Sequence, residues 1–371
     1  MKKNAFHHRF RTLCSVLVVL GSSYLLIFLS GCGPEPPPII IDGGNGGGGE
    51  DSTLVSVTEL PPIKIPADNP LTFAGVDLGR HLFYEKMLSG DGTMSCATCH
   101  NNVMSFTDNN NAVSEGIRGE KGNRNAMTVF NLMYSNSLFW DGRAATLREL
   151  ATMPIENPIE MDARVEDVLV KLNASELYKM KFKDAFGVEL IEEVHLSKAL
   201  EQFLITLVSD NSKFDKFNRG ETQLSEQEIR GFNALKIKGC FNCHSTSLMH
   251  DNLSHNTALD KNPEDKGLGG FTNDPQDNFK FKTPSLRNIM LSAPYMHDGR
   301  FNTIEEVIEF YEKIQENGLL NASANSNAPK DLMSIAPRNR LRSDEIEDVK
   351  AFLNALTDYT YINNPKFQDP F

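Results

Sequence analysis

Two copies of the motif Cys-x-x-Cys-His constrain this chain of 371 residues more than any other feature. In this order, two cysteines can form thioether bonds with the vinyl groups of one haem, and the histidine that follows can bind its iron. A zinc site would need two such pairs close together, and these begin 144 residues apart; a redox-active pair is rarely followed by histidine. The sequence therefore predicts two covalently attached c-type haems. The residues that would hold them are Cys96, Cys99 and His100, and Cys240, Cys243 and His244.

The first 31 residues have the pattern of a bacterial lipoprotein signal. Four basic residues precede an apolar run from Leu13 to Leu29, and residues 29–32 read Leu-Ser-Gly-Cys. The alternative is a transmembrane anchor, for which a run of about 17 residues is at the short limit. We favour cleavage before Cys32 and lipid on that cysteine, which would anchor an exported protein to a bacterial membrane, facing the periplasm.

The charge of the exported chain argues against nucleic acid as a partner. Loss of the signal would remove four basic and no acidic residues, which leaves 33 basic and 49 acidic residues and a formal charge of −16. A basic electron-donor protein would be attracted to such a surface. No cysteine remains for a disulfide, because Cys14 leaves with the signal, Cys32 takes the lipid and the other four lie in the haem motifs.

Composition divides the rest of the chain into three parts. Residues 32–66 are predicted to be a tether, because they are rich in proline and glycine and lack apolar periodicity. One haem domain is expected at residues 67–212 and a second at residues 213–371. Two long polar stretches, 101–125 and 251–282, would be unusual in a globular domain, so we expect them to wrap the cofactors.

Helical periodicity dominates after the tether, and no run alternates as a strand would, so the fold is expected to be mainly α. Ser225 with Glu228 fits a capping box, and Ser343 before Asp344 and Glu345 fits an N-cap followed by an acidic first turn. The predicted helices are Val76–Glu85, Ala163–Leu172, Val194–Val208, Ser225–Leu235, Ile304–Ile314 and Asp344–Ala355.

Further motifs accompany the two haem motifs in a fixed order. They are Phe106-Thr-Asp108, Arg124-Asn125, Phe139-Trp-Asp-Gly-Arg143, Pro154 and Glu160-Met161 after the first, and Thr283-Pro-Ser-Leu-Arg-Asn288 and Ala293-Pro-Tyr-Met-His-Asp-Gly299 after the second. From about Pro66 to Thr357 the chain thus resembles the bacterial dihaem cytochrome c peroxidases and MauG. The resemblance implies two cytochrome c-like haem domains, with hydrogen peroxide reduced at the first haem and electrons received at the second.

The resemblance also implies roles for individual residues. Trp140 would relay electrons between the haems, although a core tryptophan is the alternative. Glu160 would move a proton between the two peroxide oxygens; the alternative is a surface glutamate. A calcium ion is implied as well, bound by the side chain of Asn125 and the backbone carbonyls of Ser292 and Pro294, which are hard oxygen ligands.

Around the first haem the sequence departs from typical peroxidases. Those enzymes carry a histidine, in a loop before the Arg-Asn pair, that caps the first iron; here the position is Ile117, and no histidine occurs between His100 and His195. We therefore expect the first haem to be five-coordinate and open. A glutamine common in the family is replaced by Leu150, which predicts a drier pocket.

At the second haem the departure concerns the distal ligand. Typical peroxidases have methionine fourteen residues after the position of His297, where this chain has Tyr311, as MauG does. A phenolate is a hard donor that favours Fe(III) and Fe(IV). The alternative is a core tyrosine, with Met290 or Met296 as the ligand. His297 is expected to be a structural or propionate contact. We expect four other histidines to be surface or core residues: His81, His195, His250 and His255.

These patterns indicate a peroxide-dependent oxidoreductase of the MauG-like subgroup. A small cytochrome or copper protein as electron donor would make it a peroxidase, whereas oxidation of a residue on a partner protein would make it a maturation enzyme. The alternative is a dihaem cytochrome that transfers electrons or senses peroxide without turnover.

Overall fold

The structure is a computed structural model that describes residues 60–108, 110–260, 264–313 and 341–371. These residues all belong to one unit, Ile39–Phe371. The predicted signal, Cys32 and most of the predicted tether lie outside the described residues. Within the described part, every helix is too short or too polar to span a bilayer.

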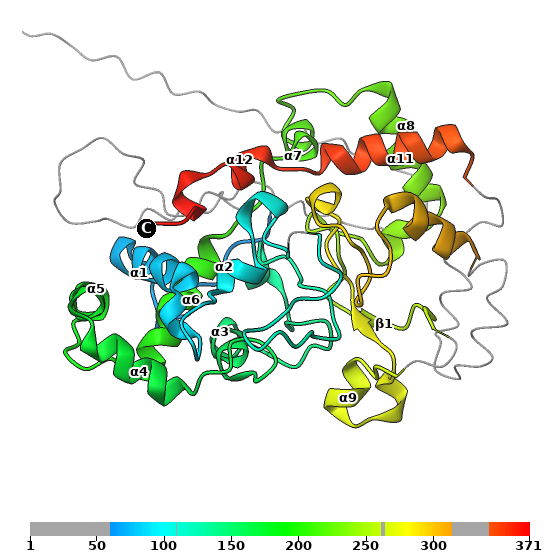
Figure 1. The fold of residues 1–371 in the computed structure, drawn as a ribbon. Coiled ribbons are helices and arrows are strands. Elements are labelled where there is room, and N and C mark those ends of the chain that lie inside the picture. The colour runs from blue at the N-terminus through cyan, green and yellow to red at the C-terminus, as the bar shows by residue number, and fades with distance from the viewer. Residues whose placement is uncertain (1–59, 109, 261–263, 314–340) are drawn as a thin grey trace, which may run out of the picture. The chain divides into compact units, whose positions relative to one another are not determined.

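The described chain is mainly α-helical, which confirms the predicted class (Figure 1). The α-helices are α1 (Phe73–Tyr84), α2 (Cys96–Cys99), α3 (Leu147–Glu156), α4 (Val165–Ala174), α5 (Glu176–Phe186), α6 (Glu193–Thr206), α7 (Lys213–Asn218), α8 (Glu226–Ile237), α9 (Leu268–Thr272), α11 (Ser343–Ala355) and α12 (Tyr359–Ile362). Residues 304–313 are also helical. The 3₁₀ helices are η1 (Lys86–Leu88), η2 (Asn102–Met104), η3 (Leu132–Tyr134), η4 (Cys240–Asn242), η5 (Pro275–Asp277), η6 (Ile289–Leu291) and η8 (Pro365–Phe367).

The strands of the described chain are two residues long. β1 (Ser254–His255) pairs antiparallel with β2 (Phe281–Lys282), with Ser254 opposite Lys282 and His255 opposite Phe281. Both lie in the polar stretch 251–282, which also contains α9 and η5. Such short pairing carries no periodic signal, so the sequence could not predict it.

Helices lie at all six predicted places, with their described ends within three residues of the prediction; Ile314 lies outside the described residues. The capping box at α8 is confirmed, since Glu228 N–H donates to Ser225 Oγ and Ser225 N–H donates to Glu228 Oε2. The N-cap of α11 was predicted wrongly. It is Arg342, because the Glu345 carboxylate accepts the Arg342 N–H at 2.8 Å and draws Ser343 into the first turn.

Two clusters of apolar side chains form the core. In the first, α1 packs against α6 and α5, and α3 packs against α6; in the second, α8 packs against α11. Cys96 packs against the first cluster and Cys240 against the second. Ile63 and Ile65, from the end of the predicted tether, also contact the first cluster.

The two motif-bearing halves repeat the same backbone features 157 residues apart. Left-handed backbone recurs at corresponding positions, and in each half an antiparallel bridge closes the segment ending in Asp-Gly-Arg. The corresponding residues are Asn131 and Asn288, Phe139 and Met296, and Gly142 and Gly299, and the bridges join Leu138 to Ala144 and Tyr295 to Phe301. By this spacing Trp140 corresponds to His297, and Asn125 corresponds to Lys282.

Candidate haem-binding sites

The first motif lies on α2 and the residue after it. Cys96, Cys99 and His100 are half-buried. Nδ1 of His100 lies 2.9 Å from the carbonyl oxygen of Phe106, to which its N–H can donate, leaving Nε2 for iron. Burial lowers the pKa of His100, which favours the neutral ring that a metal requires. The three residues therefore fit one end of a covalently attached haem.

The second motif repeats this local arrangement. Nδ1 of His244 lies 3.3 Å from the carbonyl oxygen of Met249, and burial lowers the pKa of His244. The accepting residue has left-handed backbone in both halves, at Phe106 and at Met249. This conformation is uncommon for residues other than glycine. It brings the carbonyl oxygen back to the histidine, so the same device orients both candidate iron ligands.

Glu160 lies close to the first motif. Burial raises the pKa of the Cys96 thiol to about 12 and that of Cys99 to about 11, and the Glu160 charge contributes to both shifts. Nδ2 of Asn157 donates to Glu160 Oε1 at 2.7 Å. Burial raises the pKa of Glu160, whereas this hydrogen bond and the charge of Arg143 lower it. The structure thus brings a half-buried carboxyl group, fixed at one oxygen, to the side of the first candidate haem site.

The loop that carries histidine in typical peroxidases is closed onto the segment of Glu160. The Ile117 N–H donates to the Glu160 carbonyl at 3.0 Å, and the loop is held by a hydrogen bond from Gly122 N–H to the Ser114 carbonyl at 3.0 Å. A Cβ at Gly116 would lie 1.8 Å from the carbonyl oxygen of Ile159, so only glycine fits there. The Ile117 side chain packs against the first core cluster, as does Leu150 of α3.

A cavity of about 550 Å³ adjoins the second motif, within the range of cofactor pockets. His244 lines it, and the helix at residues 304–313 brings Tyr311 to the same cavity. Burial raises the pKa of Tyr311, and Cys240 and Cys243 raise it further, so its hydroxyl stays protonated unless a cation binds the oxygen. Met296 lines the cavity too.

Met290 packs in the second core cluster and is not among the described residues that line this cavity. Of the three alternatives for the distal ligand, the structure thus brings Tyr311 and Met296 to the second site.

Trp140 lines the same cavity and is 9% exposed. Its Nε1–H donates to the Asn125 carbonyl at 2.9 Å, and its own carbonyl accepts the Lys282 N–H at 2.9 Å. The ring is therefore fixed between a segment that follows the first motif and one that follows the second.

The three predicted calcium ligands also line this cavity: Asn125, Ser292 and Pro294. The Asn125 N–H donates to the His297 carbonyl at 2.8 Å, and its Nδ2 donates to the carbonyls of Asn111 and Ala112 at 3.2 and 3.1 Å. Because the amide nitrogen is engaged, Oδ1 is the side-chain atom that could bind a cation. The donor set consists of oxygen atoms, as calcium requires.

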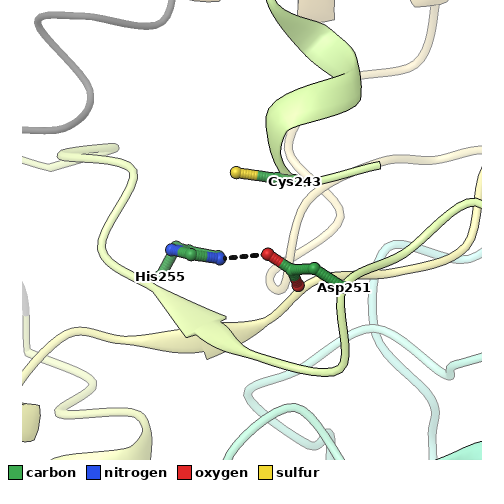
Figure 2. Close-up of side chains that lie close together, drawn as sticks. All are labelled: Cys243, Asp251 and His255. Atoms are coloured by element: carbon green, nitrogen blue, oxygen red, sulfur yellow. Dashed lines mark hydrogen bonds and ion pairs between the residues drawn. The ribbon is translucent and has the colours of Figure 1, made fainter. Parts of the chain in front are cut away.

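Figure 2 shows Asp251 and His255 beside Cys243. His255 Nε2 lies 2.7 Å from Asp251 Oδ2, and the candidate ligand atoms of the three residues lie within 4.8 Å of one another. Contact with Cys243, together with Asp251, raises the pKa of His255 to about 9. Because a thioether bond would consume the Cys243 thiolate, we interpret these residues as part of the wall around the haem's cysteine edge rather than as a separate metal site.

The other histidines of the described chain have partners within the protein. His81 Nδ1 lies 2.7 Å from the Asp77 carbonyl, and His195 Nδ1 accepts the Glu192 N–H at 3.1 Å. His250 is buried and lines the cavity beside the second motif. His297 lines it too, and its ring stacks on that of Phe281 with 3.7 Å between the ring centres. The cavity positions of His250 and His255 were missed, and that of His255 depends on the short β1–β2 pairing.

Arg287 and Asn288, which end the motif Thr283-Pro-Ser-Leu-Arg-Asn288, connect distant segments of the fold. Arg287 makes a fully buried, bidentate ion pair with Asp215 of α7, with distances of 2.8 and 2.7 Å. Asn288 Nδ2 donates to Ser209 Oγ at 2.9 Å, and its Oδ1 accepts the Asp358 N–H at 2.7 Å. The motif thus joins α7, the segment before it and the C-terminal residues.

Comparisons with known proteins place the chain in a family. Residues 73–223 match the family described as di-haem cytochrome c peroxidase. The chain is 35% identical over 312 residues to the cytochrome c551 peroxidase of Nitrosomonas europaea, covering 82% of this chain and 85% of that protein. It is 39% identical over 254 residues to the methylamine utilization protein MauG of Methylorubrum extorquens, covering 67% and 71%.

The fold is shared as well. A MauG-like protein associated with microbial copper homeostasis has a crystal structure that matches with a TM-score of 0.76 at 33% identity, covering 84% of this chain and 97% of that chain. The chain therefore belongs to the di-haem cytochrome c peroxidase family and is a peroxidase-type oxidoreductase.

Proposed function

We propose that hydrogen peroxide is reduced beside His100 with electrons that enter beside His244. Family membership implies two c-type haems, and the two histidines are pre-oriented for them. The observation that carries the proposal is that Glu160 lies close enough to the first motif for its charge to raise the pKa of both cysteines, while Ile117 occupies the loop position of the capping histidine. A carboxyl group beside an open iron is what peroxide cleavage requires.

The haem would supply the electron chemistry of peroxide reduction when bound. Glu160 moves the proton: Asn157 fixes Oε1, so Oε2 is the oxygen that can take a proton from one peroxide oxygen and deliver it to the other. Two further protons and two electrons then balance the formation of two waters. Ile117 and Leu150 are apolar and pack against the first core cluster, so they would limit water on this side and favour proton transfer through Glu160 over loss to solvent.

The electrons are proposed to pass by Trp140. Its indole is buried and donates through Nε1–H to a carbonyl of the first half, while its backbone carbonyl accepts an N–H of the second half, so a ring in a fixed orientation lines the cavity beside the second motif. Tyr311 is proposed as the distal ligand of the second iron, since it reaches the cavity of His244 and lies close to Cys240 and Cys243.

The electron donor is proposed to be a small cytochrome or copper protein, or a residue of a partner protein. The relatives are named both as cytochrome c peroxidases and as MauG. Ile117 and Tyr311 favour oxidation of a residue on a partner protein, because an open first site and a phenolate ligand suit the storage of oxidising equivalents.

Three further features belong to the proposal. A calcium ion would bind Asn125 Oδ1 and the carbonyls of Ser292 and Pro294, and would keep the segments around the cavity together. Lipid on Cys32 would hold the protein at a bacterial membrane, facing the periplasm. The boundary between the haem domains is placed at residues 212 and 213.

Steady-state turnover of hydrogen peroxide with a reduced small cytochrome tests the proposal. We expect Glu160→Gln to lower turnover by about 10²–10⁴-fold, the usual contribution of acid–base catalysis, while both haems stay attached. Glu156→Gln, an exposed carboxyl at the end of α3, is the matched control and should leave turnover unchanged.

The pH dependence follows from the same group. Glu160 must be deprotonated to accept a proton, and burial raises its pKa, so turnover should fall on acidification at a higher pH than an ordinary glutamate would give. Full turnover in Glu160→Gln, or a protein that binds peroxide but oxidises no donor, contradicts the proposal.

A further inference from the structure

Lys282 is a buried cation for which the described protein supplies no anion. It lies on β2, lines the second cavity and is only 6% exposed. Its Nζ donates to Ser135 Oγ at 2.9 Å, and burial alone lowers its pKa to about 8, with no described carboxylate close enough to oppose the shift. A charged amine with one neutral partner in an apolar setting is costly unless an anion joins it.

The carboxylates among the described residues that line this cavity are already engaged. Asp251 pairs with His255 at 2.7 Å, and Glu312 accepts the backbone N–H of Leu341. The anion that completes Lys282 must therefore come from what fills the cavity.

The internal repeat provides a second, independent observation about Lys282, because it pairs this residue with one in the first half. Lys282 corresponds to Asn125, and the two backbones make reciprocal bonds: Asn125 N–H donates to the His297 carbonyl at 2.8 Å, and Lys282 N–H donates to the Trp140 carbonyl at 2.9 Å. At this position the first half has Asn125, a neutral oxygen donor suited to a bound cation, whereas the second half has Lys282, which is itself a cation.

A haem attached to Cys240 and Cys243 would bring a propionate carboxylate, the anion that Lys282 lacks. Its vinyl edge would lie at Cys240 and Cys243, with His255 and Asp251 beside it (Figure 2), and its two propionates would leave the opposite edge. We propose that Lys282 binds a propionate of the second haem through a charge-assisted hydrogen bond. The bond would fix the haem's propionate edge next to Trp140 and place a positive charge there. This inference rests on attachment of the second haem in the proposed function.

The test is a redox titration of the holoprotein, followed by the absorption spectrum of each haem. Lys282→Met should lower the midpoint potential of the second haem, because a lost positive charge stabilises the ferric form, and should shift its propionate-bending band in resonance Raman spectra. The first haem's potential should change less. Lys282→Arg should restore both readouts, and Lys280→Met, a neighbour paired with Asp277 outside the cavity, should change neither.

Unchanged potential and unchanged propionate band in fully loaded Lys282→Met overturn the inference, and so does an equal shift of both haems. If the methionine variant does not fold, Lys282→Gln takes its place with the same expectations. Neither readout uses peroxide turnover, so failure here is distinct from failure of the proposed peroxidase activity.

Discussion

The two candidate haem sites differ in single residues rather than in framework. Each has a histidine held through Nδ1 by a nearby carbonyl, at 2.9 and 3.3 Å. Ile117 at the first site is a partly buried apolar side chain that packs against the first core cluster, whereas Tyr311 at the second reaches the cavity of His244. Under the proposed function, the chemistry of the chain depends on which distal atom each site offers to iron.

Tyr311→Phe tests the distal ligand of the second haem. Removal of the phenolate should change the low-spin ferric spectrum and raise the midpoint potential of this haem, because a hard anionic donor favours Fe(III). Tyr295→Phe is the matched control: Tyr295 lines the same cavity, but its hydroxyl donates to the Ile289 carbonyl at 3.1 Å. A Tyr311→Phe spectrum identical to that of the unaltered protein would discredit the assignment.

Residues that carry chemistry in a fixed spacing could be predicted from the sequence. The structure places Glu160 close to the first motif and Trp140 in the cavity beside the second, and their roles stay predictions. Lys282 and His255 could not be predicted, because what distinguishes them is burial in one cavity through a two-residue strand pair. A lysine in a polar stretch gives no sign of burial before the fold is known.

At the scale of elements, α1 and α6 pack so closely that no side chain fits at Gly79. A Cβ at Gly79 would lie 2.0 Å from the Ala199 carbonyl oxygen and 2.8 Å from the Cβ of Phe203. Backbone atoms cannot rotate away as a side chain can, so the helices would have to separate. The first core cluster thus depends on a glycine that hydrophobic patterning does not single out.

Gly79→Ala should therefore lower the free energy of unfolding by ~1–3 kcal/mol, the usual cost of overpacking. Gly270→Ala on α9 is the control. Its new methyl group would meet no atom closer than 3.6 Å, and alanine favours helix, so stability should be equal or slightly higher. Denaturant unfolding of the holoprotein measures both, and equal stability of the two variants would contradict this account of the α1–α6 contact.

Six helices were predicted, and others, α3 and α5 among them, were missed for physical reasons. α3 contains Pro154 in its last turns, which argues against a helix on sequence alone. In α5, Leu177 and Met180 are exposed and only Tyr178 and Phe182 are buried, so its apolar residues do not mark one face. Tertiary packing, rather than local pattern, decides both helices.

At the scale of the whole molecule, the chain's C-terminal end contributes to the first site. Tyr361 and Phe367 belong to the first core cluster, although they follow the second motif by more than a hundred residues. The Tyr361 ring lies 5.7 Å from that of Phe106, whose carbonyl orients His100. Division of the sequence into two consecutive halves could not predict this return, because aromatic packing between distant segments leaves no local pattern.

The repeat at a spacing of 157 residues also emerges only at this scale. It relates Trp140 to His297 and Asn125 to Lys282, pairs that differ in side chain and share backbone hydrogen bonding. One framework, used twice, thus carries two different sets of side chains. The same asymmetry underlies the central claim that the first haem is open and the second is capped.

Electron paramagnetic resonance of the oxidised, resting holoprotein tests that claim most directly. An open iron at His100, with Ile117 in the place of a ligand, should give a high-spin ferric signal, and an iron ligated by His244 and Tyr311 should give a low-spin signal of equal amount. A spectrum with both signals is the predicted result, and a purely low-spin spectrum would contradict the account.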